Sequence, residues 1–263
     1  KFGFEKMSSN PNDIILDNKI NTVFIATHHD THAKFVVDSI LQNKSVFVEK
    51  PLAINLNELE NITKIVREDT RLMVGFNRRF SPLIKKTKSI LGKNKLPCSI
   101  VYTINAGEID NNHWSLNKDI GGGRIVGEVC HFIDLLRYIT DSKIRSWQFI
   151  NIDNLKDCLS IHLKFENGSI ASINYFTNGN RKYSKENIEI FNDSKIIKIE
   201  NFIKLSFYGY KGIRNIRLWT QDKGQKECLR VFVDSILKNK QPPIPINELI
   251  EVSKIAIDIN ESL

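Results

Sequence analysis

The 263-residue chain is 41% apolar and carries a formal net charge of +8, which suits one large or two modest globular domains with a substantial core. No apolar run approaches the roughly 18 residues of a membrane span, and the first residues lack the apolar segment of a secretory signal, so we expect a cytoplasmic protein without membrane insertion. The lysines are dispersed rather than interleaved with exposed aromatics, which argues against a nucleic-acid partner and favours a solvated basic surface over attraction for an anionic ligand.

The first half of the chain alternates short apolar strands with amphipathic helices. This order, with short connections, predicts right-handed βαβ units in a parallel sheet covered on both faces. A dinucleotide-binding fold opens with a glycine-rich turn over the pyrophosphate, and no GxGxxG occurs in the sequence. We therefore expect an incomplete Rossmann-type domain over residues 1–96, in a chain that starts after the first one or two βα units. The predicted strands are 21–27, 45–50 and 71–77, and the predicted helices are 30–44 and 55–69.

The pattern changes near residue 96, where antiparallel strands with Asn, Asp and Gly turns replace the alternation. We expect a second domain over residues 97–263, for substrate binding and oligomerisation, with a mixed or antiparallel sheet and helices on one face. The fold class is thus α/β plus α+β. Apolar alternation in 160–165 and 169–176 predicts that the other face is buried in a homo-oligomer. The predicted strand regions are 98–107, 146–152, 157–178, 187–209 and 212–222, and the predicted helices are 121–140, 226–240 and 247–263.

The four cysteines show no CxxC spacing and no pairing with histidines at metal-site intervals. They therefore predict reduced, mostly buried thiols and no metal site. They are Cys98, Cys130, Cys158 and Cys228.

The second predicted strand ends on a charged pair and a proline: Glu49, Lys50 and Pro51. The carboxyl ends of parallel strands are where open α/β sheets bind ligands, so Lys50 is placed to reach a crevice. By strand alternation Glu49 points to the opposite face, and Pro51 fixes the following turn with a peptide bond that can be cis. The alternative is a plain sheet edge with a surface lysine.

The stretch "GGGRIVGEVCHFID" passes from a glycine turn into a helix. Three glycines let the backbone come close to another group, and the helix then carries Glu128 and His131 three positions apart. Asp134, a further three positions on, can orient the imidazole or face solvent. A lone histidine in such a helix is more often structural, so a joint role with Lys50 requires that the two halves meet in a cleft.

Further polar residues follow the other predicted strands. The first strand is followed by Thr27 and three histidines, which can donate to a cofactor or pack the helix start, and the third by Asn77 and Arg78, of which Arg78 suits an anionic or sugar ligand. Trp114, in the polar loop 108–120, can stack on a sugar or belong to a plain lid, whereas Tyr175 is first a core or interface residue. The three histidines are His28, His29 and His32.

Several segments together resemble the Gfo/Idh/MocA oxidoreductase family. "VFVEKPLA", preceded by "VFIATHHDTHA" and followed by "MVGFNRRFSP", is similar to its Glu-Lys-Pro signature after a Rossmann strand, and "GGGRIVGEVCHFID" to its histidine-bearing helix. The likeness continues to the closing segment and spans nearly the whole chain. The wording "GEVCHFID" is most similar to members fused behind a zinc-type alcohol dehydrogenase-like domain, which implies an N-terminally truncated chain.

The resemblance implies an NAD- or NADP-dependent oxidoreductase that moves a hydride between nicotinamide and a hydroxyl or ketone of a sugar, polyol or nucleotide-sugar. It implies Lys50 and His131 as catalytic residues. Many relatives carry Asp at the position of Gly127, and others carry an acid three residues before the histidine, which Glu128 matches as a candidate. The missing phosphate loop leaves open the alternative of a non-catalytic ligand-binding or assembly module. The implied cofactor contacts are Thr27, His28, His29, His32, Glu49, Lys50, Pro51, Asn77 and Arg78, and the implied substrate contacts are Lys50, Arg78, Trp114, Glu128, His131 and Tyr175.

Overall fold

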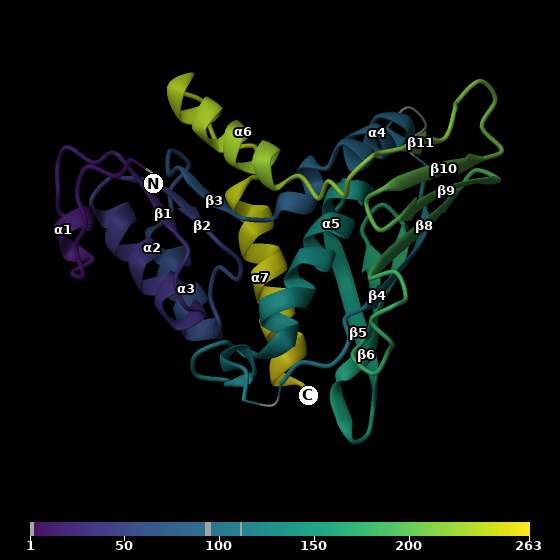
Figure 1. The fold of residues 1–263 in the computed structure, drawn as a ribbon, viewed down its shortest axis with the longest axis horizontal. Helices are drawn as coiled ribbons and strands as arrows, with labels where there is room; N and C mark the ends of the chain where they lie inside the picture. The colour runs from purple at the N-terminus through teal and green to yellow at the C-terminus, as the bar shows by residue number, and fades with distance from the viewer. Residues whose placement is uncertain (1–2, 93–95, 111) are drawn as a thin grey trace.

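A small parallel sheet and a large mixed sheet stand on either side of a layer of helices in the computed structural model, which describes residues 3–92, 96–110 and 112–263 (Figure 1). The small sheet has the order β1-β2-β3, and both of its strand pairs are parallel, as predicted. Its strands are shorter than predicted because the polar residues at their carboxyl ends leave the ladder. They are β1 (Thr22–Ile25), β2 (Ser45–Val48) and β3 (Leu72–Val74).

The two predicted helices of this half form, and their starts follow from local chemistry. Helix α3 (Leu56–Ile65) begins at Asn55, whose side chain accepts from the Glu58 N–H at 2.9 Å, while the Glu58 carboxylate accepts from the Ile54 N–H at 2.9 Å. Helix α2 (His32–Leu41) follows a short 3₁₀ segment, η1 (His29–Thr31). Three elements were not predicted: α1 (Asn12–Ile15), η2 (Asn77–Phe80) and α4 (Pro82–Leu91).

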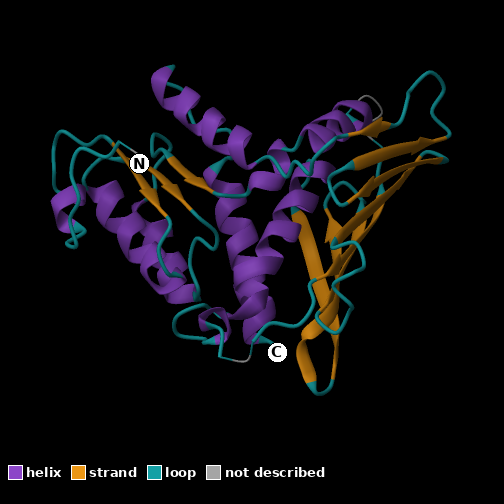
Figure 2. Ribbon diagram, in the orientation of Figure 1, coloured by secondary structure: helices purple, strands orange, loops and turns teal. Residues whose placement is uncertain are grey.

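The large sheet, drawn in orange on the right of Figure 2, has eight strands among the described residues. Their order is β11-β10-β9-β8-β4-β7-β6-β5. Strand β4 pairs in parallel with β7 and antiparallel with β8, so the sheet is mixed, as predicted. The predicted strand 212–222 is wrong in length, since only Ile216–Arg217 pairs there, as β11. The other strands are β4 (Ser99–Asn105), β5 (Ile144–Ile152), β6 (Leu155–Phe165), β7 (Ile170–Phe176), β8 (Glu186–Asn192), β9 (Lys195–Glu200) and β10 (Lys204–Tyr208).

The apolar alternation of β6 and β7 faces the helices rather than the outer surface. Ile161 and Ile173 are fully buried, and Tyr175 packs 6.0 Å, ring to ring, from Phe132 of the helix α5 (Cys130–Thr140). The alternate positions face outward and are mostly polar, as at His162, although Ile170 and Phe176 at the ends of β7 are exposed apolar residues. This pattern therefore explains the core and gives no argument for a homo-oligomer.

The C-terminal helices reach back to the first half of the chain. Helix α7 (Ile246–Glu261) lies between the two sheets and contacts α3, β3 and α5 (Figure 1). Helix α6 (Gln225–Leu237) places the Phe232 ring 5.6 Å from Phe24 and 5.5 Å from Phe47, on the small sheet. The predicted boundary after residue 96 thus separates the two sheets, while the last helices cover both.

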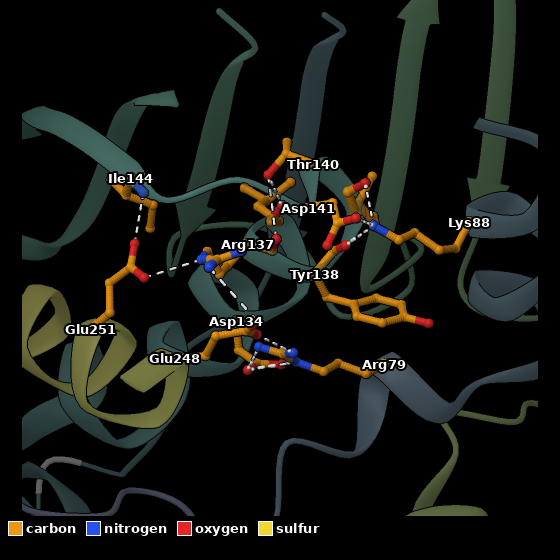
Figure 3. Close-up of polar contacts among 12 residues, drawn as sticks. Arg79, Lys88, Asp134, Arg137, Tyr138, Thr140, Asp141, Ile144, Glu248 and Glu251 are labelled. Atoms are coloured by element: carbon orange, nitrogen blue, oxygen red, sulfur yellow. Dashed lines mark hydrogen bonds and ion pairs between the residues drawn. The ribbon is translucent and has the colours of Figure 1, made fainter. Parts of the chain in front are cut away.

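Buried ion pairs connect η2, α5 and α7 (Figure 3). The Arg79 guanidinium donates to both Asp134 oxygens at 2.8 Å and lies 2.6 Å from Glu248. Arg137 pairs with Glu251 at 3.1 Å, and Glu251 also accepts from the Ile144 N–H at 2.6 Å. The suggestion that Asp134 orients His131 is therefore wrong, because its carboxylate is fully engaged by Arg79.

Within the described ranges, no helix combines the length and apolar character that crossing a membrane requires. All four cysteines are free and buried, as predicted.

Candidate active site

Lys50 and His131, from opposite halves of the chain, line one cavity of about 320 Å³. This volume is at the small end of the range for small-molecule sites, about 300–1,000 Å³. The two residues therefore meet in a common cavity, which is the geometric condition that the sequence left open. The cavity is also lined by His29, Arg78, His113, Trp114, Ser115, Gly123, Arg124, Gly127, Glu128, Phe132 and Lys185.

Lys50 enters the cavity just beyond the carboxyl end of β2. Its peptide bond to Pro51 is cis, and its Nζ donates to the Gly127 carbonyl at 2.6 Å. That carbonyl belongs to the short π-helical segment η4 (Ile125–Val129), which leads directly into α5. π-helical turns inside α-helices occur frequently at functional sites. The bond fixes the lysine of the first half against the helix that carries His131.

The glycine turn before η4 lets a loop lie directly on the helix start. Gly122 and Gly123 have φ angles of +70° and +83°, which glycine adopts without strain. A Cβ on Gly121 would lie 2.3 Å from the Ser115 Cα, so this position has no room for a side chain. The Gly121 carbonyl is 2.8 Å from the Nδ1 of His29. The close approach predicted for these glycines is confirmed.

His131 is almost wholly buried, and neither ring nitrogen hydrogen-bonds to any other described residue. Its ring meets Phe76 edge to face, with centroids 5.9 Å apart. Burial, with the positive charges of Arg78 and Lys50, lowers the pKa of His131 well below its usual value. The imidazole is therefore neutral at pH 7 and able to accept a proton.

His29 occupies the space above Gly127. A Cβ at residue 127 would lie 3.2 Å from the His29 Cε1, closer than ordinary contact. Burial, together with the charge of Lys50, lowers the pKa of His29 to about 4, so this ring is also neutral at pH 7. The position four residues before His131 thus holds no acid, and an imidazole lies in its place.

Among the described residues that line this cavity, Glu128 is the one with a carboxylate side chain. It is half-buried and lies 3.4 Å from the Nε of Arg124, which in turn donates to the Gly107 carbonyl at 2.9 Å. The Arg124 guanidinium stacks over the Tyr175 ring, 5.3 Å from its centre. Glu128 is therefore placed at the cavity by a buried arginine.

Arg78 lines the cavity, but its guanidinium is committed to a carboxylate. Its Nε and Nη2 each donate to Glu186 at 2.8 Å, and Glu186 also accepts from Lys223 at 2.6 Å and from Tyr102. Although burial raises the pKa of Glu186, Arg78 and Lys223 bring it down to about 2. Arg78 can still offer positive charge to a ligand, but its Nε and Nη2 donors are already bound to Glu186.

A neighbouring cavity of about 300 Å³ is lined by two predicted site residues that do not line the Lys50 cavity, Glu49 and Asn77. Glu49 lines it, which confirms the alternation predicted for the strand end, and Asn77 lines it while donating to the Lys223 carbonyl at 2.7 Å. Arg78 and His131 line both cavities, so the two hollows adjoin at the same side chains.

Trp114 closes one side of the cavity with two histidines of the first half. The His28 ring stacks on it at 4.7 Å with an interplanar angle of 2°, and His29 meets it edge-on at 4.7 Å. Asn111 of the predicted loop 108–120 lies outside the described residues.

Five predicted site residues line neither of these two cavities: Thr27, His28, His32, Pro51 and Tyr175. His32 is fully buried, with its ring nitrogens 2.8 Å from the Pro51 carbonyl and 3.1 Å from the Thr27 carbonyl, so it braces the turn after Lys50. Tyr175 is fully buried beneath Arg124. His32 thus supports the turn after Lys50, and Tyr175 supports Arg124. Thr27 is exposed at the end of β1 and bonds to Thr31 at 2.6 Å.

Arg124 and Lys185 are cavity residues that the sequence did not indicate. Arg124 directly follows the glycine triplet, and this position is a sequence signal that could have identified it. Lys185 lies in an ordinary basic stretch, "RKYSK", and carried no signal.

Comparisons with known proteins cover both halves. One family model, described as the oxidoreductase family with an NAD-binding Rossmann fold, matches residues 1–76, and the GFO/IDH/MocA C-terminal domain matches residues 98–198. The chain is 24% identical to the uncharacterised oxidoreductase YrbE of Bacillus subtilis, over 98% of this chain and 80% of that protein. It is 24% identical to myo-inositol 2-dehydrogenase of Thermotoga maritima, over 92% of this chain and 77% of that protein.

The same fold is found in a structure of levoglucosan dehydrogenase in complex with NADH and levoglucosan. The TM-score is 0.84 at 21% identity, over 99% of this chain and 83% of that chain. None of these comparisons supports the predicted truncation or the fusion behind a zinc-type alcohol dehydrogenase-like domain.

Proposed function

Because the chain belongs to the Gfo/Idh/MocA family of NAD-binding oxidoreductases, we propose that its interdomain cavity is the active site of a dehydrogenase for a polyol or sugar hydroxyl. The observation that carries this proposal is that Lys50 and His131 line the same cavity. The inositol and levoglucosan dehydrogenases among the similar proteins support the substrate class.

The proposed chemistry divides between the two residues. Oxidation of a hydroxyl requires a group that accepts the O–H proton, and His131 is neutral and has no hydrogen-bond partner among the described residues. It also requires positive charge near the oxygen as negative charge develops there, which the Lys50 ammonium supplies. NAD, when bound, accepts the hydride from the carbon.

The polar residues at the carboxyl edge of the small sheet suit the nicotinamide end of the cofactor. Thr27, His28, His29, Lys50 and Pro51 follow β1 and β2, at the edge where such sheets bind ligands. We place Glu49, Asn77 and Arg78 in the same role from the adjoining cavity. The sequence carries no GxGxxG, so no residue is assigned to the pyrophosphate.

The absence of that motif favours one rival function, a non-catalytic ligand-binding or assembly module. Calorimetric titration of the chain with NAD⁺ and NADH separates the two. Saturable binding at micromolar concentration supports the dehydrogenase, and loss of that binding in Lys50→Ala places the cofactor at this cavity. The absence of binding supports the module.

We further propose a cytoplasmic location and a homo-oligomer. The four free, buried thiols suit a reducing compartment. Val101, Ile170 and Phe176 are exposed on the outer face of the large sheet, where a second copy would cover them. Sedimentation analysis tests the assembly: Ile170→Asp is expected to lower the native mass, and a monomeric wild-type chain contradicts it.

A further inference from the structure

The cavity that holds Lys50 and His131 is lined by an excess of positive charge. Four cationic side chains line it, against one carboxylate, that of Glu128. A cavity lined by one sign of charge concentrates ligands of the other sign. The four cations are Lys50, Arg78, Arg124 and Lys185.

Two of these cations have carboxylate partners. Arg78 is bound in bidentate fashion by Glu186 at 2.8 Å. Arg124 lies 3.4 Å from Glu128 and 3.5 Å from Asp157, but its Nε forms no hydrogen bond with any described residue, although its side chain is only 2% exposed. This nitrogen is closed off from solvent, so Arg124 contributes positive charge to the cavity rather than a free donor.

The other two cations have no carboxylate partner among the described residues. Lys50 donates to a neutral carbonyl, that of Gly127, at 2.6 Å. The Lys185 ammonium forms no hydrogen bond or ion pair within the described part of the chain. Its charge nevertheless reaches the catalytic region, since it is among the positive charges that add to burial in lowering the pKa of His131.

The backbone around Gly107 joins Arg124 to the segment that carries Lys185. Arg124 donates to the Gly107 carbonyl at 2.9 Å, and a Cβ on Gly107 would lie 3.2 Å from the Cγ of Arg181. Lys185 then directly precedes β8. Arg124 and Lys185, which we call the basic wall, thus both come to the cavity from the second half of the chain.

We propose that the substrate of this enzyme carries an anionic group, a carboxylate or a phosphate ester, which binds the basic wall while its hydroxyl reaches Lys50 and His131. The inference rests on the proposed function for the identity of the bound molecule as substrate. Arginine and lysine bind both kinds of anion through charge-assisted hydrogen bonds. The exposed Lys185 ammonium, unpaired among the described residues, supplies the donor, and the charge of Arg124 adds to the attraction.

The experiment measures binding of matched ligands to the chain in the presence of NADH. Glucuronate and glucose 6-phosphate are compared by calorimetry with glucose, and the two acids distinguish a carboxylate site from a phosphate site. We expect at least one acid to bind about tenfold or more tightly than glucose, because a charge-assisted hydrogen bond contributes that much. Equal binding of acids and glucose, or binding of neither acid, overturns the inference.

Variants assign the effect to the basic wall. Lys185→Gln is expected to remove the preference for the acid and to leave NADH binding unchanged, whereas the exposed neighbour Lys182→Gln is expected to retain it. Weaker NADH binding in Lys185→Gln, with the acid preference intact, would assign the wall to the cofactor and contradict the inference. If the acid preference holds while no ligand is oxidised, the proposed dehydrogenase fails and the anion site stands. If neutral polyols are oxidised and the acids are not preferred, the proposed dehydrogenase stands and the anion site fails.

Discussion

His131 owes its chemistry to its surroundings rather than to its position in a helix. A histidine with an ordinary pKa, about 6.5, would be partly protonated in slightly acidic solution. Burial, Arg78 and Lys50 all disfavour the protonated ring, so the base remains available at lower pH. In the proposed mechanism, the residues that line the cavity therefore set the pH range in which the enzyme works.

The first prediction concerns this pH range. As pH falls, kcat/KM for oxidation should stay level through pH 6.5 and decline only below it, since the depressed pKa of His131 delays protonation. Initial rates of NADH formation between pH 5 and 9 measure this. An acid limb centred at or above pH 6.5 would contradict a buried, neutral His131 as the base.

Glu186 provides a second prediction at this scale. Burial raises the pKa of its carboxyl, but Arg78 and Lys223 outweigh it and the pKa falls to about 2. A carboxylate with a depressed folded-state pKa stabilises the protein above its unfolded pKa, about 4.5, and this contribution is lost as pH falls toward 2. Urea unfolding should therefore show a loss of stability between pH 5 and 3 that is smaller in Glu186→Gln.

That variant should itself be less stable at pH 7. Removing one partner of a buried ion pair leaves the other charge uncompensated and costs about 3–5 kcal/mol. The exposed pair of Lys198 and Glu189, 3.2 Å apart, offers a control, because Glu189→Gln should cost less than about 1 kcal/mol. Equal losses in the two variants would show that Glu186 is not the buried anchor described here.

Residue-level reasoning from the sequence identified two residues that line one cavity, because their positions in the chain point there. Lys50 follows a strand at the sheet edge that binds ligands, and His131 follows a glycine turn, so both were predicted. Arg124 and Lys185 reach one cavity through contacts between segments that are apart in the chain, such as that of Arg124 with the Gly107 carbonyl. No pattern within either segment encodes that contact.

At the scale of elements, the segment η4 joins the glycine turn to α5 and brings the Gly127 carbonyl to Lys50. The absence of a side chain at Gly127 leaves room for His29, which binds the Gly121 carbonyl. The first half of the chain thus contacts the middle of this segment and the glycine turn before it. The geometry of η4 depends on Gly127, because a side chain at this position would displace the His29 imidazole.

Gly127→Ala tests this arrangement. The added Cβ would lie 3.2 Å from the His29 Cε1, so we expect a loss of about 1–3 kcal/mol in unfolding free energy, the usual cost of overpacking. In a His29→Ala background the same substitution should cost less, because the crowded ring is gone. Additive losses in the double variant would show that His29 and Gly127 do not interact.

The elements themselves were predictable in kind and less so in length. Periodicity identified β1 to β3, α2 and α3 because each has one apolar face, and the alternation of β6 and β7 matched a sheet with one buried face. Helix α4 was missed because its Pro82 start resembles a turn, and only Leu83, Ile84 and Thr87 of it are buried. The outward face of the sheet was misjudged because alternation does not say which face is inside.

At the scale of the whole molecule, α7 and the buried ion pairs hold the two sheets in one arrangement (Figure 1, Figure 3). Arg79 comes from the end of the small sheet, Asp134 from α5 and Glu248 from α7. Their meeting joins the end of the small sheet to these two helices. Sequence patterns give no account of this arrangement, because each of the three charges lies in a different element.

Asp134→Asn should therefore weaken the whole fold. The substitution leaves the buried Arg79 with Glu248 as its remaining carboxylate, and we expect a loss of about 3–5 kcal/mol in the free energy of unfolding by urea. Asp234→Asn, in the exposed pair with Arg230, is the matched surface control and should cost under about 1 kcal/mol. A loss as small in Asp134→Asn would contradict a structural role for the ion pairs.

The most direct test of the central claim is NAD⁺ reduction by the wild-type chain and by Lys50→Ala and His131→Ala, each with a thermal unfolding curve, across a panel of polyols, sugars and sugar acids. The account predicts NADH formation by the wild type, and a fall of about 100-fold or more in each variant with the fold retained, as expected for loss of acid–base or charge-stabilising groups. Wild-type turnover that persists unchanged in either folded variant would contradict it.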